Sequence, residues 1–197
     1  FGAGSARSPQ ATREFRRMRP YVDFLTTIDV ELAADHDFDQ QGRVLDRLLH
    51  DLGRMNARAT LFVTANAAEC FSERLLRWQE AGHEIACHGL KHSESEDYSA
   101  MPAEVIRSMV QEATATIARV TGARPACFRG PRMTTSVATL RALVEAGYRA
   151  DFSVCSQRLD LFNSKGATAG WLIAPRKPYH PSEDSPFRRG DMPLTVV

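Results

Sequence analysis

The sequence predicts an α/β protein in which strands and helices alternate along the chain. Short apolar runs alternate with segments of helical periodicity, and a glycine follows each of these helical segments. Acidic, imidazole and guanidinium side chains follow the apolar runs. This alternation is typical of a parallel sheet or barrel covered by helices. The length of 197 residues, with 43% hydrophobic and 25% charged residues, suits one globular domain.

Five strands are expected before residue 154, at 21–28, 59–65, 83–88, 126–129 and 148–153. The intervening helices are expected at 41–56, from the second strand to about residue 81, at 102–122 and at 134–147. Apolar residues recur at helical spacing in these segments, and the first one has Val44, Leu45, Leu48, Leu49 and Leu52. Pro102 suits the first turn of the third helical segment, where its missing N–H costs nothing.

The predicted helices end at Gly53, Gly82, Gly122 and Gly147, each shortly before the next strand. Glycine accepts the left-handed conformation that commonly closes a helix, so the repeat predicts four similar helix-to-strand junctions. Glycines placed by chance in loops are the alternative.

The two ends of the chain differ from its middle. Residues 1–20 are polar and rich in arginine, which indicates a loosely ordered leader segment before a domain at 21–197. After Ser153 the alternation stops, and only 171–175 and the last residues resemble strands. An α/β barrel is not expected to stop on a beginning strand, so we expect this domain to be truncated at its C-terminus.

Composition excludes several classes of protein. The formal net charge of +1 provides no basic face for nucleic acid. No run approaches the roughly 18 apolar residues of a membrane span.

The cysteines are widely spaced and are expected to be unpaired, buried side chains: Cys70, Cys87, Cys127 and Cys155. This is typical of the cytoplasm, unless a leader has been removed before residue 1. No pattern indicates an oligomeric state.

Candidate metal ligands follow the first and third predicted strands. Asp29 and Glu31 are two residues apart in extended chain, so their side chains point the same way. His88 and His92 have the i, i+4 spacing at which two imidazoles reach one ion. Two nitrogens and one carboxylate with open positions describe a catalytic zinc site. A turn with two histidines and no ion is the alternative.

Two further charged residues belong to later strands. Arg129 lies at the end of the fourth strand and Asp151 lies in the fifth. Because the carboxyl ends of parallel barrel strands carry the active site, we expect these side chains at the same face as the histidines. Asp151 either orients Arg129 or only ends its strand.

Taken in order, four short motifs resemble those of the polysaccharide deacetylases, carbohydrate esterase family 4, also called the NodB-homology domain. They are TTIDVE (26–31), HGLKHS (88–93), FRGPR (128–132) and YRADFS (148–153). The resemblance covers roughly residues 21–197 and implies a distorted, incomplete (β/α) barrel. The family removes N- or O-acetyl groups from polysaccharides such as chitin, peptidoglycan and xylan, using a divalent metal that is commonly zinc.

The resemblance also implies roles for single residues. Asp29 corresponds to the catalytic base, and Arg129 to the arginine that holds this base. His88 and His92 correspond to the metal-binding histidines. The backbone amide of Arg132 corresponds to the donor that stabilises the tetrahedral oxyanion.

This sequence departs from the family pattern at four places. The usual fourth motif carries a tryptophan or aspartate pair, whereas residues 150–156 offer only Asp151. Many members have two adjacent aspartates, whereas Val30 follows Asp29 here. A branch of the family, which includes peptidoglycan-deacetylase-like and allantoinase-like proteins, has an acidic residue one place later, and Glu31 fits this variant. Glu31 would then be the third metal ligand. The family usually has an aromatic residue at the position of Arg132. The general-acid histidine of a late LxH-like motif is missing before Val197, and the only late histidine, His180, lies in a proline-rich stretch.

The resemblance therefore implies a metal-dependent hydrolase that removes acetyl groups, most simply from an N-acetyl amide, from a polysaccharide or N-acetylated sugar. Two alternatives remain: a metal-independent hydrolase of C–N bonds of the allantoinase-like type, and a degenerate carbohydrate-binding or assembly module without turnover. Metal content, resistance to chelators and acetate release distinguish the three. Which polymer is used, and N- against O-deacetylation, are not indicated.

Overall fold

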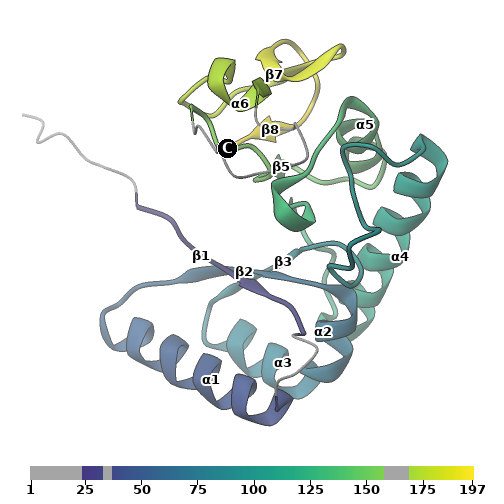
Figure 1. Ribbon diagram of the computed structural model, residues 1–197. Coiled ribbons are helices and arrows are strands. Elements are labelled where there is room, and N and C mark those ends of the chain that lie inside the picture. Colours follow the sequence, from purple (N-terminus) through teal and green to yellow (C-terminus); the bar gives the residue numbers. More distant parts are fainter. Residues whose placement is uncertain (1–23, 33–36, 158–168) are drawn as a thin grey trace, which may run out of the picture.

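Six parallel strands form one sheet in the computed structural model, which describes residues 24–32, 37–157 and 169–197 (Figure 1). The strand order is β1-β2-β3-β4-β5-β8, and within the described residues β1 and β8 do not pair with each other. The sheet is therefore open, which confirms the predicted incomplete barrel. The strands are β1 (Thr26–Val30), β2 (Ala59–Val63), β3 (Glu84–Cys87), β4 (Cys127–Phe128), β5 (Ala150–Asp151) and β8 (Thr195–Val196).

Helices follow most of these strands, as the alternation predicts. They are α1 (Phe38–Arg54), α2 (Ala65–Cys70), α3 (Ser72–Glu80), α4 (Ala103–Thr121), the 3-10 turn η1 (Pro131–Met133), α5 (Val137–Glu145) and α6 (Ala169–Ile173). Figure 1 shows α1, α2 and α3 on one side of β1–β3 and the C-terminal elements on the other. The predicted leader 1–20 lies outside the described residues.

The two faces of the sheet carry different kinds of side chain. Val30, Leu61 and Val63 are completely buried and belong to the core that packs against the helices. Because side chains alternate along a strand, Asp29 and Phe62 point to the opposite face, which is the barrel interior. Burying each apolar side chain of the helix-facing set stabilises the fold by roughly 1.5–3 kcal/mol. The interior face is thus free to carry polar groups.

Three of the four predicted helix-ending glycines are confirmed. Gly82, Gly122 and Gly147 have φ values of 87°, 73° and 82°. The predicted helix end at Gly53 is wrong, because α1 continues through this residue to Arg54. The left-handed residue there is Asn56, with φ 54°, and the Ala57 amide closes the helix by donating to the Leu52 carbonyl at 2.9 Å. Asparagine is the residue after glycine that best tolerates this conformation.

The segment after β2 contains two helices where the periodicity predicts one. The chain breaks at Phe71, which has φ −103° and ψ 23° and separates α2 from α3. Phe71 is 3% exposed, and its ring centroid lies 6.3 Å from that of the buried Trp78. Core packing of this aromatic pair therefore overrides the helical periodicity.

The described residues after Ser153 contain more helix and strand than the sequence predicts. The expected strand at 171–175 is wrong, because α6 covers Ala169–Ile173. This short helix buries Trp171, which is 3% exposed, and leaves Ile173 61% exposed. An antiparallel hairpin follows, formed by β6 (Pro181–Ser182) and β7 (Ser185–Arg189), before β8 joins the main sheet.

The cysteines match the prediction only in part. All four are free, but only Cys87 is buried, and Cys70 is exposed. Among the described residues, none of the helices combines the length and the hydropathy that a membrane span requires.

Candidate active site

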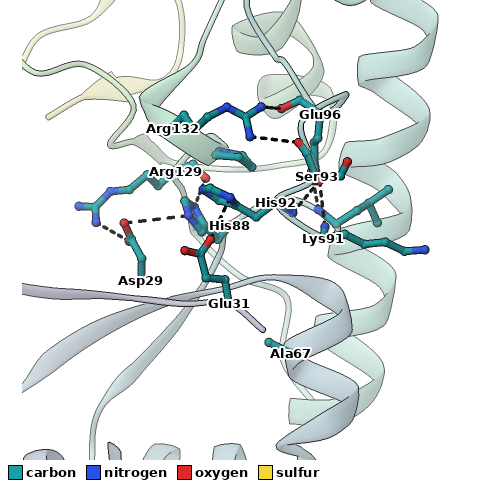
Figure 2. Close-up of polar contacts among 12 residues, drawn as sticks. Asp29, Glu31, Ala67, His88, Lys91, His92, Ser93, Glu96, Arg129 and Arg132 are labelled. Atoms are coloured by element: carbon teal, nitrogen blue, oxygen red, sulfur yellow. Dashed lines mark hydrogen bonds and ion pairs between the residues drawn. The ribbon is translucent and has the colours of Figure 1, made fainter. Parts of the chain in front are cut away.

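The predicted site residues meet at the carboxyl ends of three strands of the sheet (Figure 2). The parallel register aligns Val30 with Val63, Val63 with Cys87 and Cys87 with Phe128. The residues that directly follow three of these positions are Glu31, His88 and Arg129, so the register brings them to one edge. This juxtaposition agrees with the expectation from the strand-end pattern.

Glu31, His88 and His92 form a candidate metal centre. Their potential ligand atoms all lie within 4.8 Å of one another, and Glu31 Oε2 is 3.1 Å from His92 Nδ1. Glu31 Oε2 is buried, yet no described residue forms a hydrogen bond with it. Two ligand atoms on a tetrahedral zinc ion are about 3.3 Å apart for bond lengths near 2.0–2.1 Å. This buried oxygen, which forms no hydrogen bond within the described residues, and its 3.1 Å distance from His92 Nδ1 therefore fit a shared divalent cation.

His88 is oriented by the backbone of the neighbouring strand end. The ring is 2% exposed, and Nδ1 lies 2.8 Å from the Arg129 carbonyl oxygen. That carbonyl only accepts, so Nδ1 carries the proton and the lone pair of Nε2 points into the site. Burial lowers the pKa of His88, although the Asp29 charge opposes this shift. The imidazole is thus kept neutral, which is the form that binds a metal.

Asp29 lies beside the candidate metal centre and is held by Arg129. The Arg129 Nη1 donates to Asp29 Oδ1 at 2.6 Å, and Nη2 donates to Thr27 Oγ1 at 3.0 Å. The guanidinium carbon lies 4.1 Å from the centroid of the Phe62 ring. The second carboxylate oxygen, Asp29 Oδ2, is 4.0 Å from His88 Nε2 and faces the candidate metal ligands.

Arg132 turns its side chain away from Asp29 and toward the histidine loop. The guanidinium donates to the carbonyl oxygens of Ser93 and Glu96 at 3.0 and 2.7 Å (Figure 2). Its backbone has φ 53°, and its amide has no backbone acceptor among the described residues. This N–H is therefore free to donate, while its role as the oxyanion donor stays a prediction.

Asp151 supports the site indirectly. It is completely buried and accepts hydrogen bonds from the Ser153 amide and hydroxyl, at 3.2 and 2.5 Å, and from the Thr135 hydroxyl. The Ser153 hydroxyl oxygen in turn accepts the Gly130 amide at 2.8 Å. Asp151 thus positions the loop after β4 and forms no ion pair with Arg129. Burial raises the pKa of Asp151 to about 6.

The late histidine lies away from this edge. His180 Nδ1 is 2.9 Å from the Leu194 carbonyl oxygen, and Leu194 precedes β8. Tyr179 pairs antiparallel with Val196, so the chain at His180 runs toward the amino end of β8. The site face is at the carboxyl ends of the strands, and His180 is therefore not placed to act there.

Sequence reasoning missed Thr27, Phe62 and Glu96. Thr27 was within reach of the alternation rule, because it lies two residues before Asp29 on the same face of β1. Phe62 required the strand register, which places it opposite Asp29. Glu96 had no sequence signal, because its contacts depend on how the loop after β3 folds back.

An open parallel sheet with a carboxylate–histidine cluster at its carboxyl edge defines the class: a barrel-like α/β protein with a candidate metal centre. Residues 36–150, more than half of the chain, match the polysaccharide deacetylase family model, and the chain belongs to this family. A peptidoglycan deacetylase from Helicobacter pylori is 29% identical over 110 residues, which cover 56% of this chain and 36% of that protein.

Solved structures agree with this assignment. A family 4 carbohydrate esterase from Bacillus anthracis matches with a TM-score of 0.53 and 28% identity, over 65% of this chain and 57% of the other. A Mycobacterium smegmatis protein described as a polysaccharide deacetylase matches with a TM-score of 0.59 and 20% identity, over 89% and 59%. The chain thus spans about a third of the curated relative and less than two thirds of these structures.

Proposed function

We propose that the chain is a metal-dependent deacetylase that hydrolyses the acetyl amide of an N-acetylated sugar unit in a polysaccharide. The observation that carries the proposal is the cluster of Glu31, His88 and His92 within 4.8 Å, with Asp29 beside it. Family membership supports the reaction class. The two-nitrogen, one-oxygen donor set suits zinc or a similar divalent ion with open positions.

Glu31, His88 and His92 would hold the ion. When bound, a divalent cation supplies Lewis acidity, which makes water more acidic and the acetyl carbonyl more electrophilic. The protein's own contribution is to aim both imidazoles at one point and to keep the buried His88 neutral. The Arg129 carbonyl does this for His88 by fixing its tautomer.

Asp29 would take the proton of the attacking water. Arg129 occupies Oδ1, which leaves Oδ2 directed at the cluster. The guanidinium is fixed by Thr27 and by the Phe62 ring, so the carboxylate need not reorganise during the reaction. The free amide of Arg132 is the candidate donor to the oxyanion.

The leaving nitrogen must also receive a proton. The other described histidines lie elsewhere: His50 is on α1, His83 precedes β3 at its amino end, and His180 lies at the amino end of β8. With these histidines away from the site, Asp29 would return its proton to the departing amine.

Metal content and acetate release of the purified protein test this proposal. Wild type is expected to retain about one zinc per chain and to release acetate from N-acetylated chitin oligomers or peptidoglycan fragments, with O-acetylated xylan as the comparison for ester cleavage. His92→Ala is expected to lose both properties. His50→Ala changes an exposed histidine on α1 and is the matched control.

Each alternative has its own outcome in the same experiment. Acetate release that persists without metal and in the presence of a chelator would contradict metal dependence and favour a metal-independent C–N hydrolase. Sugar binding without acetate release from any of the three substrates would favour a degenerate binding module. Equal, negligible metal in wild type and His92→Ala would refute the candidate metal centre.

A further inference from the structure

A buried carboxylate outside the predicted site holds the loop that carries both histidines. Glu96 is 1% exposed and lies beyond the HGLKH segment, in the turn before α4. Figure 2 shows its side chain directed at the backbone between Lys91 and His92, on the side of this loop away from Asp29. The proposed chemistry does not use this carboxylate.

The contacts of Glu96 are all with hydrogen-bond donors. Oε1 accepts the Leu90 amide at 2.6 Å and the Tyr98 hydroxyl at 3.1 Å. Oε2 accepts the amides of Lys91 and His92, both at 2.9 Å. An ionised carboxylate accepts only, so this set of donors matches it, and hydrogen bonds to a charged acceptor are stronger than neutral ones.

The loop has an unusual backbone that needs such support. His92 has φ 58°, a left-handed conformation that only a few per cent of non-glycine residues adopt, although histidine is among the residue types enriched there. Gly89 has φ 78°, and a Cβ there would come within 2.3 Å of Glu96 Oε1. The absence of a side chain at Gly89 therefore leaves the space that the Glu96 carboxylate occupies.

The opposite side of the loop is held by a helix end. The amides of Ala65 and Asn66, at the start of α2, donate to the carbonyl oxygens of Gly89 and Leu90 at 3.0 and 3.1 Å. Amides of α2 thus bind the carbonyl oxygens of Gly89 and Leu90, while Glu96 accepts the amides of the three residues from 90 to 92. The peptide planes that aim His92 at Glu31 are fixed from both sides.

The Glu96 backbone connects this loop to the neighbouring one. Its carbonyl oxygen accepts the Arg132 guanidinium, which also donates to the Ser93 carbonyl oxygen. Arg132 belongs to η1, the turn after Arg129. The two loops at the site therefore share one hydrogen-bonded connection through residue 96.

We propose that Glu96 is a positioning residue for the metal centre, whose carboxylate sets the affinity of the site by fixing the left-handed His92 and its loop. This inference rests on the proposed metal site. Outer partners that orient metal ligands typically change metal affinity roughly 10- to 100-fold when they are removed.

The test is the dissociation constant of Zn²⁺ for the full chain, measured by competition with a chelating indicator at a temperature where circular dichroism shows the folded protein. Glu96→Gln replaces one acceptor oxygen with an NH₂ group that meets backbone N–H groups. We expect its Zn²⁺ dissociation constant to rise roughly 10- to 100-fold, with a changed absorption spectrum of the Co²⁺ form. A role in folding alone would lower the melting temperature without altering that spectrum.

Two variants serve as controls. Glu94→Gln makes the same chemical change at an exposed position of the same loop, and it should bind Zn²⁺ as wild type does. Tyr98→Phe removes one donor to Glu96 and leaves the three amides in place, so its Zn²⁺ affinity should change by less than about threefold. Glu94→Gln measures the effect of losing one negative charge in this loop, and Tyr98→Phe measures the effect of losing the hydroxyl contact. The remaining effect of Glu96→Gln is then due to its contacts with the three amides.

The outcomes distinguish this inference from the proposed function. Wild-type protein that binds no Zn²⁺ overturns both. Wild type that binds Zn²⁺, with unchanged affinity and Co²⁺ spectrum in Glu96→Gln, overturns the positioning role alone. If Glu96→Gln does not fold, Glu96→Asp decides: its shorter side chain cannot reach all three amides, so wild-type affinity in that variant also overturns the inference.

Discussion

Arg129 and Asp29 are 100 residues apart in the chain, yet Arg129 Nη1 donates to Asp29 Oδ1 at 2.6 Å. The guanidinium makes a second hydrogen bond to Thr27 and lies over the Phe62 ring. Arg129 is thus held from three directions, and its side chain is 12% exposed. The orientation of the proposed base depends on this arrangement.

Arg129→Lys is expected to lower kcat by roughly 10- to 100-fold while zinc content stays at the wild-type level. Lysine keeps the charge, but it cannot bond Asp29 and Thr27 together or stack on Phe62 as a planar guanidinium does. Steady-state acetate release and metal analysis check this. Arg119→Gln, which breaks an exposed ion pair with Glu69, is the control and should leave both quantities unchanged.

Asp29→Asn should separate chemistry from metal binding. The amide cannot accept the proton of water, so we expect acetate release to fall by roughly 10²- to 10⁴-fold. Zinc should remain bound, because Asp29 is not among the three clustered ligands. Loss of zinc together with activity would show instead that Asp29 is itself a ligand.

The raised pKa of the buried Asp151 should make the stability of the folded protein depend on pH. Its pKa is about 6 in the folded protein, against 3.8 for the ordinary group, because it is buried. Between these values the unfolded chain has released the proton while the folded chain keeps it. This contribution to stability is complete below pH 3.8 and is lost as the pH rises toward about 6.

Asp151→Asn removes this titration while keeping the size of the side chain. Between pH 4 and pH 7, the variant should gain about 2 kcal/mol in unfolding free energy relative to wild type. Urea unfolding of both proteins at several pH values measures the difference. A difference independent of pH would show that Asp151 is ionised in the folded state throughout this range.

Gly53 and Gly122 form a matched pair, because a Cβ added at either position would meet no neighbouring element within 4 Å. Gly122→Ala forces a side chain into a left-handed conformation and should cost about 1–2 kcal/mol. Gly53→Ala lies inside α1 and should stabilise the protein by roughly 0.5–1 kcal/mol. Thermal unfolding that moves both variants in the same direction would contradict these backbone assignments.

Periodicity located the helices but chose their buried faces imperfectly. Leu45 and Leu49 of α1 are buried as expected, whereas Val44 and Leu48 are 63% and 42% exposed. The stripe of five apolar residues is therefore wider than the buried face of α1. The choice between adjacent helix faces depends on the neighbour, which periodicity does not describe.

By itself, the sequence determined the alternation of strands and helices up to β5, the left-handed ends at Gly82, Gly122 and Gly147, and the common side of Asp29 and Glu31. These features follow from backbone sterics and from the two-residue repeat of a strand, which act over a few residues. Family motifs added the expected roles of the strand-end residues.

Only the tertiary structure decided which of these groups touch. The 3.1 Å approach of Glu31 to His92, the stacking of Arg129 on Phe62 and the capture of the histidine loop by Glu96 depend on strand register and loop folding. Such contacts join residues that local propensity treats as independent. Their geometry exists only after the sheet has aligned the strand ends and the core has closed around them.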